Sequence, residues 1–271
     1  MSKSQGLPFF VSIPHSGEDV PDEVTWLSDL EEPTLMRDVD RFVDDLYSPV
    51  ISEADLLAVK TQWHRYVVDL NRLEDEFDED SVEGAPHGVG THPKGLHWSV
   101  TTHGEQLIKV PMTMELHNKL VSSYYNPFHG SVSGMREKIK KDFGVVYHLD
   151  LHSMPSKGTN LHPDPGQTRA EIVVSDYHGS SAEEPYRDIV MKAYQEAGFQ
   201  VAYNWPYVGG GVTRRYGKPE EKCHTIQVEL NRMLYMNEDT KKKSDLFLET
   251  QKKLTVAVKS ILKNLKQHLE K

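Results

Sequence analysis

The sequence contains a single cysteine, Cys223, among its 271 residues. No disulfide can form within such a chain, so the cysteine content suits a reducing compartment and we expect a cytoplasmic protein. Long apolar runs are missing as well, since stretches such as 9–11 fall far short of the roughly 20 residues that a membrane helix needs. Residues 1–8 lack the apolar core of a signal peptide. We therefore expect neither a signal peptide nor a membrane span.

Positive charge is also in deficit, with 31 lysines and arginines against 41 aspartates and glutamates, a formal net charge of −10. Nucleic-acid backbones and anionic membrane surfaces attract proteins with the opposite balance, so we expect neither as a partner. Hydrophobic residues make up 37% and charged residues 27% of the chain, which is typical of a folded globular protein. A chain of this length can bury one large core or two smaller ones.

Apolar, β-branched and aromatic stretches alternate with segments of helical periodicity along the chain. The first kind predicts strands at 7–13, 56–60, 65–70, 145–151, 171–175, 199–203 and 225–230. The second kind predicts helices at 34–47, 112–125, 133–142 and 182–197, and a long C-terminal helix marked by Phe247, Leu254, Val258, Ile261 and Leu265. This alternation predicts an α/β fold with a largely parallel or mixed sheet. No linker or repeat is evident, so residues 1–271 are expected to form a single domain.

Residues 74–106 depart from this pattern, because they carry clustered Asp, Glu and Gly residues and little periodicity. We expect a long loop inserted into the domain, and loops of this length in compact chains usually serve a function. The segment holds four histidines, at positions 87, 92, 97 and 103. A second metal site is one interpretation of them, but their irregular setting favours solvated side chains.

Three polar clusters lie at the ends of predicted strands, where open α/β sheets place their sites. In the first, His15 and Glu18 follow the strand at 7–13. A short turn can direct both at one cation, and catalytic zinc commonly takes two His and one Glu. A helix cap with a surface carboxylate would produce the same spacing, so the spacing alone does not decide.

The second cluster is the segment 148–153, His-Leu-Asp-Leu-His-Ser. Side chains two apart share one face of a strand, so His148, Asp150 and His152 face the same way. His152, at the strand end, is a candidate third metal ligand, and Asp150 can hold the other nitrogen of a ligand histidine. For His148 a buried polar network is the favoured interpretation.

The third cluster spans 65–72, where strand alternation places Arg65, Asp69 and Asn71 on one face and Arg72 at the end. Arginine guanidinium groups suit carboxylates and developing oxyanions, although a structural Asp–Arg pair would have the same sequence.

Two later segments add further polar groups. A glycine-rich loop at 204–222 carries Arg214 and Arg215, and it lacks the Gly-Lys-Ser/Thr of a phosphate-binding loop. Glu229 lies inside an otherwise apolar strand, where a carboxylate is costly unless it is paired or serves a function.

Taken together, these segments identify a family resemblance. The matching segments are 14–17, 65–72, 150–153, 204–217 and 227–229, and with their order they resemble N-formylglutamate amidohydrolases over about residues 9–236. The Asp-Leu-Asn-Arg segment also resembles aspartoacylases and, more distantly, zinc carboxypeptidases. These relatives imply a mixed twisted sheet flanked by helices, of the zinc carboxypeptidase and phosphorylase/hydrolase-like kind, with a single Zn²⁺ per chain.

The resemblance also implies roles for individual residues. The implied metal ligands are His15, Glu18 and His152. The implied catalytic residues are Glu229, which activates a water and protonates the leaving amine, and Arg65, which polarises the scissile carbonyl. The implied substrate-binding residues are Asn71 and Arg72, with Arg214 or Arg215 as a second cationic contact.

On this basis we expect a zinc-dependent amidohydrolase acting on a small acidic N-acyl amino acid. The reaction implied is hydrolysis of N-formyl-L-glutamate to formate and L-glutamate, a step of histidine degradation. A related zinc amidase or carboxypeptidase acting on a peptide or cell-wall fragment is the alternative. Ser153 or Cys223 as a nucleophile is disfavoured, because Ser153 lacks a Gly-x-Ser-x-Gly elbow and a strand directs Cys223 and His224 to opposite faces. A metal-stabilised binding protein would leave Glu229 without a purpose.

Overall fold

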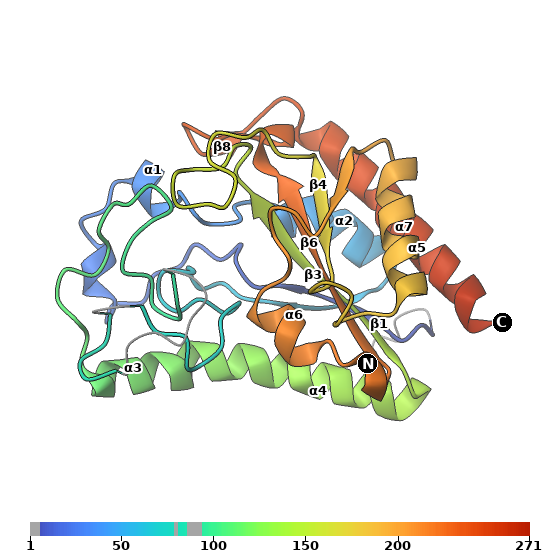
Figure 1. Ribbon diagram of the computed structural model, residues 1–271, viewed down its shortest axis with the longest axis horizontal. Helices are drawn as coiled ribbons and strands as arrows, with labels where there is room; N and C mark the ends of the chain where they lie inside the picture. The colour runs from blue at the N-terminus through green and yellow to red at the C-terminus, as the bar shows by residue number, and fades with distance from the viewer. Residues whose placement is uncertain (1–5, 79–80, 86–93) are drawn as a thin grey trace.

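The computed structural model describes residues 6–78, 81–85 and 94–271 (Figure 1). The main sheet is built from β1 (Phe9–Ile13), β2 (Leu57–Lys60), β3 (Val146–Met154), β4 (Ile172–Ser175), β5 (Val201–Tyr203) and β6 (Cys223–Asn231). The helices are α1 (Glu32–Leu35), α2 (Val43–Glu53), α3 (Met114–Leu120), α4 (Asn126–Phe143), α5 (Glu184–Glu196), α6 (Gly211–Tyr216) and α7 (Phe247–Leu269). A two-stranded ribbon of β7 (Met236–Asn237) and β8 (Lys242–Lys243) lies apart from the sheet.

The sheet has the strand order β2-β1-β3-β6-β4-β5. Its first four strands are parallel, whereas β4 runs antiparallel to β6 and β5 follows β4. The central strands β3 and β6 are nine residues long and buried throughout, as expected of parallel strands covered on both faces. They pair in register from Val146 opposite Cys223 to Met154 opposite Asn231, which places His152 beside Glu229.

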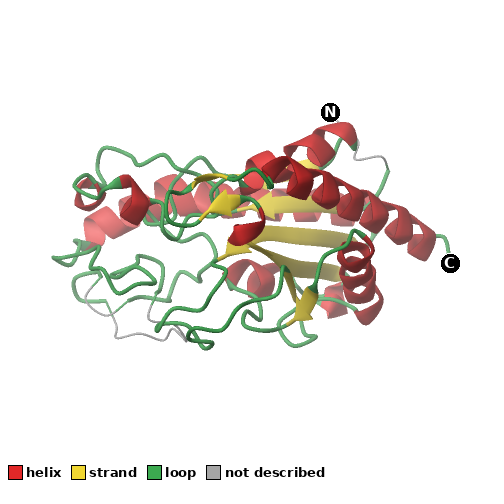
Figure 2. Ribbon diagram, turned by 90° about the horizontal axis from the view of Figure 1, so that it is seen from above, coloured by secondary structure: helices red, strands yellow, loops and turns green. Residues whose placement is uncertain are grey.

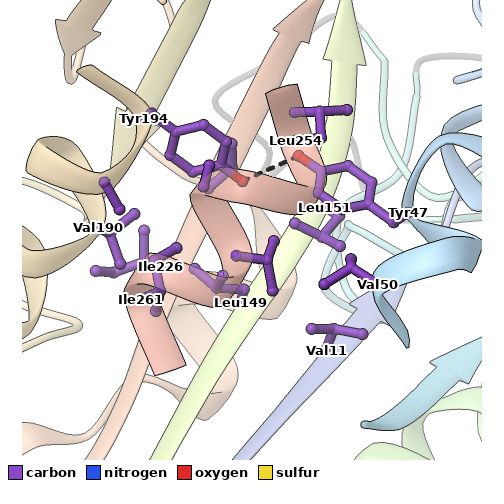
Figure 3. Close-up of a cluster of buried hydrophobic side chains, with 14 of the residues drawn as sticks. Val11, Tyr47, Val50, Leu149, Leu151, Val190, Tyr194, Ile226, Leu254 and Ile261 are labelled. Atoms are coloured by element: carbon purple, nitrogen blue, oxygen red, sulfur yellow. Dashed lines mark hydrogen bonds between the residues drawn. The ribbon is translucent and has the colours of Figure 1, made fainter. Parts of the chain in front are cut away.

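Helices cover both faces of the sheet (Figure 2). On one face α2, α5 and α7 pack with β1, β3, β4 and β6 around a large apolar core. Figure 3 shows this core, in which the Tyr47 and Tyr194 hydroxyl groups are 3.0 Å apart and so satisfy each other among aliphatic side chains. On the other face α3, α4 and α6 pack, together with described residues between Val59 and Met112, against a second core.

The α/β fold class with a mixed sheet is confirmed, but several predicted elements need correction. Residues 65–70 form no strand, because Val67, Val68 and Leu70 bury their side chains against the second core instead of pairing in the sheet. The predicted helix at 34–47 is divided into α1 and α2, since Phe42 adopts a left-handed conformation (φ 69°) between them. The glycine-rich loop contains α6.

The helices predicted separately at 112–125 and 133–142 are not divided by a break near Asn126-Pro127. Helix α3 continues through a π-turn at Val121–Tyr125 into α4, and the Asn126 amide donates to the Val121 carbonyl. Pro127 has no amide hydrogen with which to continue this helix, and the π-turn lies directly before it. In the part of the chain that the structure describes, no helix has both the length and the apolarity to cross a membrane.

The described parts of 74–106 pack onto the second core. His87 and His92 lie outside the described residues. His97, expected to be solvated, is instead fully buried, and its Nε2 is 3.0 Å from Nδ1 of His117. Burial lowers the pKa of His97 to about 3, so this histidine is a neutral core residue.

Candidate active site

The parallel strands bring the polar clusters together. His15 follows β1, His152 lies near the carboxyl end of β3, and Glu229 lies beside His152 on β6. All three line one cavity of about 160 Å³ at this edge of the sheet. The sequence prediction that these segments meet is thereby confirmed, and the position agrees with the usual place of sites in open α/β sheets.

A cluster suited to a metal ion is formed by His15, Asp40 and His152, whose ligand atoms all lie within 4.8 Å of one another. The Asp40 Oδ2 atom is 3.1 Å from Nδ1 of His152 and 3.6 Å from Nδ1 of His15. The three side chains are almost completely buried. Two imidazoles and one carboxylate form the ligand set of an open catalytic zinc site.

Buried aspartates fix both imidazoles in the orientation that a metal requires. Nε2 of His15 is 2.8 Å from Asp69 Oδ1, and Nε2 of His152 is 2.7 Å from Asp150 Oδ2. Each Nε2 therefore carries a proton, so Nδ1 is the atom that each ring offers to a cation, in His152 once the proton shared with Asp40 has left. Nδ1 of His15 is buried without a hydrogen-bond partner among the described residues, which is the atom that a cation would satisfy.

The electrostatics of the cluster favour a cation. Although burial opposes its ionisation, the neighbouring imidazoles of His15 and His152 hold the pKa of Asp40 well below its usual range. Burial likewise opposes charge on His152, but Asp150 and Asp40 raise its pKa well above the usual value. The additional proton of His152 lies between its ring and Asp40, where a metal ion would bind. We therefore expect metal binding to release this proton.

Glu18, the implied third ligand, is not part of the cluster. Its carboxylate is 34% exposed and pairs with Arg41, Nε to Oε1 2.8 Å. After β1 the chain pairs with the segment that follows β2, since Asp19 and Trp63 form a parallel bridge. Asp40 takes the position expected for Glu18, held there by its own amide, which donates to the carbonyl of His15.

Glu229 is the cavity carboxyl group whose pKa is raised towards neutrality. Burial raises its pKa to about 7, and Asp40 adds to this, while His152, Arg232 and Arg65 oppose it. A carboxyl group with a pKa near neutrality can both accept and return a proton, the property that general acid–base catalysis requires.

A chain of amides orients Glu229. The Val212 amide donates to Asn71 Oδ1, so Asn71 Nδ2 donates to Gln227 Oε1, which also accepts from the Gly210 amide. Gln227 Nε2 must then donate to Glu229 Oε1, at 2.9 Å. A Cβ at Gly210 would overlap the Asn71 amide, so glycine is required there. Asn71 therefore orients Glu229 through Gln227, and both ends of the Asn71 side chain are occupied by protein partners.

Arg65 and Arg72 also line the cavity. Arg65 donates to the Asp38 carbonyl and to Asp69 Oδ2, and its guanidinium lies 4.4 Å from the Trp98 ring. Its Nε atom is buried without a hydrogen-bond partner among the described residues. Arg72 donates to the carbonyl oxygens of Lys94 and Asn71.

Arg214 and Arg215 lie elsewhere. They line a separate hollow on the surface, where Arg214 pairs with Glu76 and Arg215 lies near Glu74. The loop lines the cavity with residues 206–210 before α6 begins, and α6, absent from the prediction, carries Arg214 and Arg215 in its last turn at the separate hollow.

Several cavity residues were given no role from the sequence, and Asp40, Lys94, Trp98 and Arg232 are among them. Asp40 lies in a segment predicted to be helical, although its Asp-Val-Asp pattern was a possible signal. Lys94 and Trp98 line the cavity from the irregular segment 74–106, and Arg232 lines it from the residue directly after β6.

Comparisons with known proteins agree with this geometry. Residues 7–236 match the family model described as N-formylglutamate amidohydrolase. An N-formylglutamate deformylase of Pseudomonas putida is 27% identical over 242 residues, 88% of this chain and 85% of that protein. One of Pseudomonas aeruginosa is 25% identical over 240 residues, 86% and 83% of the two chains. The crystal structure of an N-formylglutamate amidohydrolase from Ralstonia eutropha JMP134 superposes with a TM-score of 0.85 at 27% identity, covering 97% of this chain and 95% of that one.

Proposed function

The chain belongs to the N-formylglutamate amidohydrolase family, and on that premise we propose that its cavity hydrolyses N-formyl-L-glutamate to formate and L-glutamate with one bound Zn²⁺. The observation that carries the proposal is the buried cluster of His15, Asp40 and His152 beside Glu229. The family match supports the reaction class, and the printed function of two relatives supports the substrate.

The donor set fits the metal that the family implies. His15, Asp40 and His152 would hold it, with Asp69 and Asp150 fixing the imidazoles. When bound, a zinc ion supplies a Lewis acid that lowers the pKa of a water molecule to about 7. The remaining catalytic work belongs to side chains of this chain.

Glu229 is the proton carrier of the proposed reaction. Its carboxylate accepts a proton from the attacking water while the water oxygen bonds to the formyl carbon. It then donates that proton to the amide nitrogen as the carbon–nitrogen bond breaks, so formate and the free amine of glutamate leave. Gln227 occupies Oε1 of Glu229, which leaves Oε2 to exchange the proton.

The two cavity arginines have separate roles in this proposal. Arg65 offers its unpartnered Nε to the oxygen on which negative charge develops, as an oxyanion donor does. Arg72 binds a carboxylate of the substrate, since its guanidinium suits planar anions. Cys223 takes no part, because it lies at the opposite end of β6 from Glu229.

The assay of formate release tests this proposal directly. We expect the purified protein to hydrolyse N-formyl-L-glutamate faster than N-formyl-L-leucine, by about 10-fold or more, because an unpaired cavity cation disfavours neutral substrates. A protein that prefers neutral N-acyl amino acids or a peptide amide would instead act as a broader amidase. A folded preparation without formate release from any N-formyl amino acid would contradict the proposal.

A further inference from the structure

The cavity holds two cations without a carboxylate partner. Four cationic residues line it, namely Arg65, Arg72, Lys94 and Arg232. Arg65 pairs with Asp69 and Arg232 pairs with Asp40. Among residues 6–78, 81–85 and 94–271, no carboxylate lies within ion-pair distance of Arg72 or Lys94. Two positive charges are therefore available to a ligand.

Lys94 is built into the cavity wall. Only 6% of the residue is exposed, and its Nζ lies 5.7 Å from the centre of the Trp98 ring. Trp98 is itself fixed, since its indole nitrogen donates to Asp69. The Lys94 carbonyl accepts a 2.6 Å hydrogen bond from Arg72 Nε, which ties the two cationic residues together.

The surroundings of Lys94 leave its charge uncompensated. Burial lowers the pKa of Lys94, and the neighbouring charges of Arg72 and Arg65 lower it further, although Asp38 and Asp78 act in the opposite direction. A buried ammonium group is costly unless an anion pairs with it. A ligand with one carboxylate would neutralise Arg72 and leave this group unpaired, whereas a dicarboxylate would satisfy both.

We propose that Lys94 binds the second carboxylate of the substrate, with Arg72 binding the first, and that Lys94 makes the enzyme selective for N-acyl dicarboxylic amino acids. This inference rests on the proposed function and adds to it the residue that determines specificity. Lys94 thereby takes the role that the family resemblance implied for Arg214 or Arg215, which lie outside the cavity.

The test compares N-formyl-L-glutamate with N-formyl-L-glutamine, which has the same shape and lacks the second charge. We expect Lys94→Met to raise KM for N-formylglutamate and lower kcat/KM on the order of 10- to 100-fold, the contribution of a charge-assisted hydrogen bond. The kcat/KM for N-formylglutamine stays within about threefold of wild type, since that substrate makes no such bond. The Lys94→Arg variant retains part of the preference for glutamate.

Two control variants separate specificity from general damage. Lys241 is a matched lysine, because it is only 7% exposed and borders the hollow next to the cavity without lining the cavity. Lys241→Met and the double variant Arg214→Gln/Arg215→Gln should both retain the glutamate preference. Loss of the preference in the double variant, with retention in Lys94→Met, would overturn the assignment in favour of α6.

The failure of this inference is distinguishable from failure of the proposed function. If wild type hydrolyses both substrates and a folded Lys94→Met keeps their ratio, only the assignment of Lys94 is overturned. If wild type hydrolyses neither substrate, the proposed function is wrong, and the assignment of Lys94 that rests on it is overturned with it. Should Lys94→Met not fold, Lys94→Gln provides the same ratio with a polar side chain, and an unchanged ratio there overturns the assignment equally.

Discussion

Replacing Glu229 by glutamine should lower kcat for N-formylglutamate by about 10²-fold or more, the usual contribution of a positioned general base. The substitution keeps the shape of the side chain and removes its ability to carry a proton. Glu229 is not among the three clustered ligands, so the variant should bind as much zinc as wild type. Turnover by stopped assay and zinc by elemental analysis, on the same preparation, check both parts.

The same group sets the expected pH dependence. Because burial raises the pKa of Glu229 to about 7, protonation as the pH falls removes the base, and kcat/KM should fall on the acid side. A bound cation nearby favours the ionised form of Glu229, so the midpoint of this fall in kcat/KM should lie at or below pH 7. The residual activity of Glu229→Gln should not show this fall on the acid side. Loss of zinc from that variant would contradict the assignment, because it would make Glu229 a ligand.

Replacing Asp40 by alanine should abolish stable metal binding, whereas replacing Glu18 by glutamine should not. Substituting a group that only supports a ligand already costs 10- to 100-fold in metal affinity, so loss of a ligand should cost on the order of 10²-fold or more. Glu18 pairs with Arg41 at a partly exposed position, and such a pair contributes little to stability. Metal titration of both apo-variants, followed by the formate assay, compares them.

Asp40→Ala also leaves the buried Arg232 without its carboxylate, so unfolding is a competing outcome. Circular dichroism and the melting temperature of the apo-protein identify it. His15→Asn is the second variant, since it removes a metal ligand and leaves the ion pair between Arg232 and Asp40 in place. Retention of wild-type zinc affinity by folded Asp40→Ala, together with its loss in Glu18→Gln, would restore Glu18 as the ligand.

Much of the site could be predicted from the sequence, because the carboxyl ends of parallel strands lie at the same edge of a sheet. The stretch at 7–13 had the continuous apolar character of a buried strand, and those at 145–151 and 225–230 alternated apolar with polar residues. Polar residues at the ends of such strands were therefore expected at one edge of the sheet. Strand periodicity also placed Asp150 on the face of the candidate ligands, where it was expected to hold a ligand histidine, and in the structure it lies 2.7 Å from Nε2 of His152.

The remaining residues depend on conformations that periodicity does not encode. Asp40 lies in the irregular connection before α2, where Phe42 takes a left-handed conformation, and helical spacing had concealed both. Lys94 and Trp98 reach the cavity from a segment without regular structure, so their place depends on tertiary packing alone. Arg214 and Arg215 were misplaced because the loop assumed to carry them contains α6.

The most direct test of the central claim measures metal and activity on one sample. The protein is purified without chelator, its zinc content is determined, and formate release from N-formylglutamate is followed before chelation, after chelation, and after zinc is restored. The account predicts about one zinc per chain, loss of activity when it is removed and recovery when it returns. Full activity in a folded protein without any transition metal would contradict it.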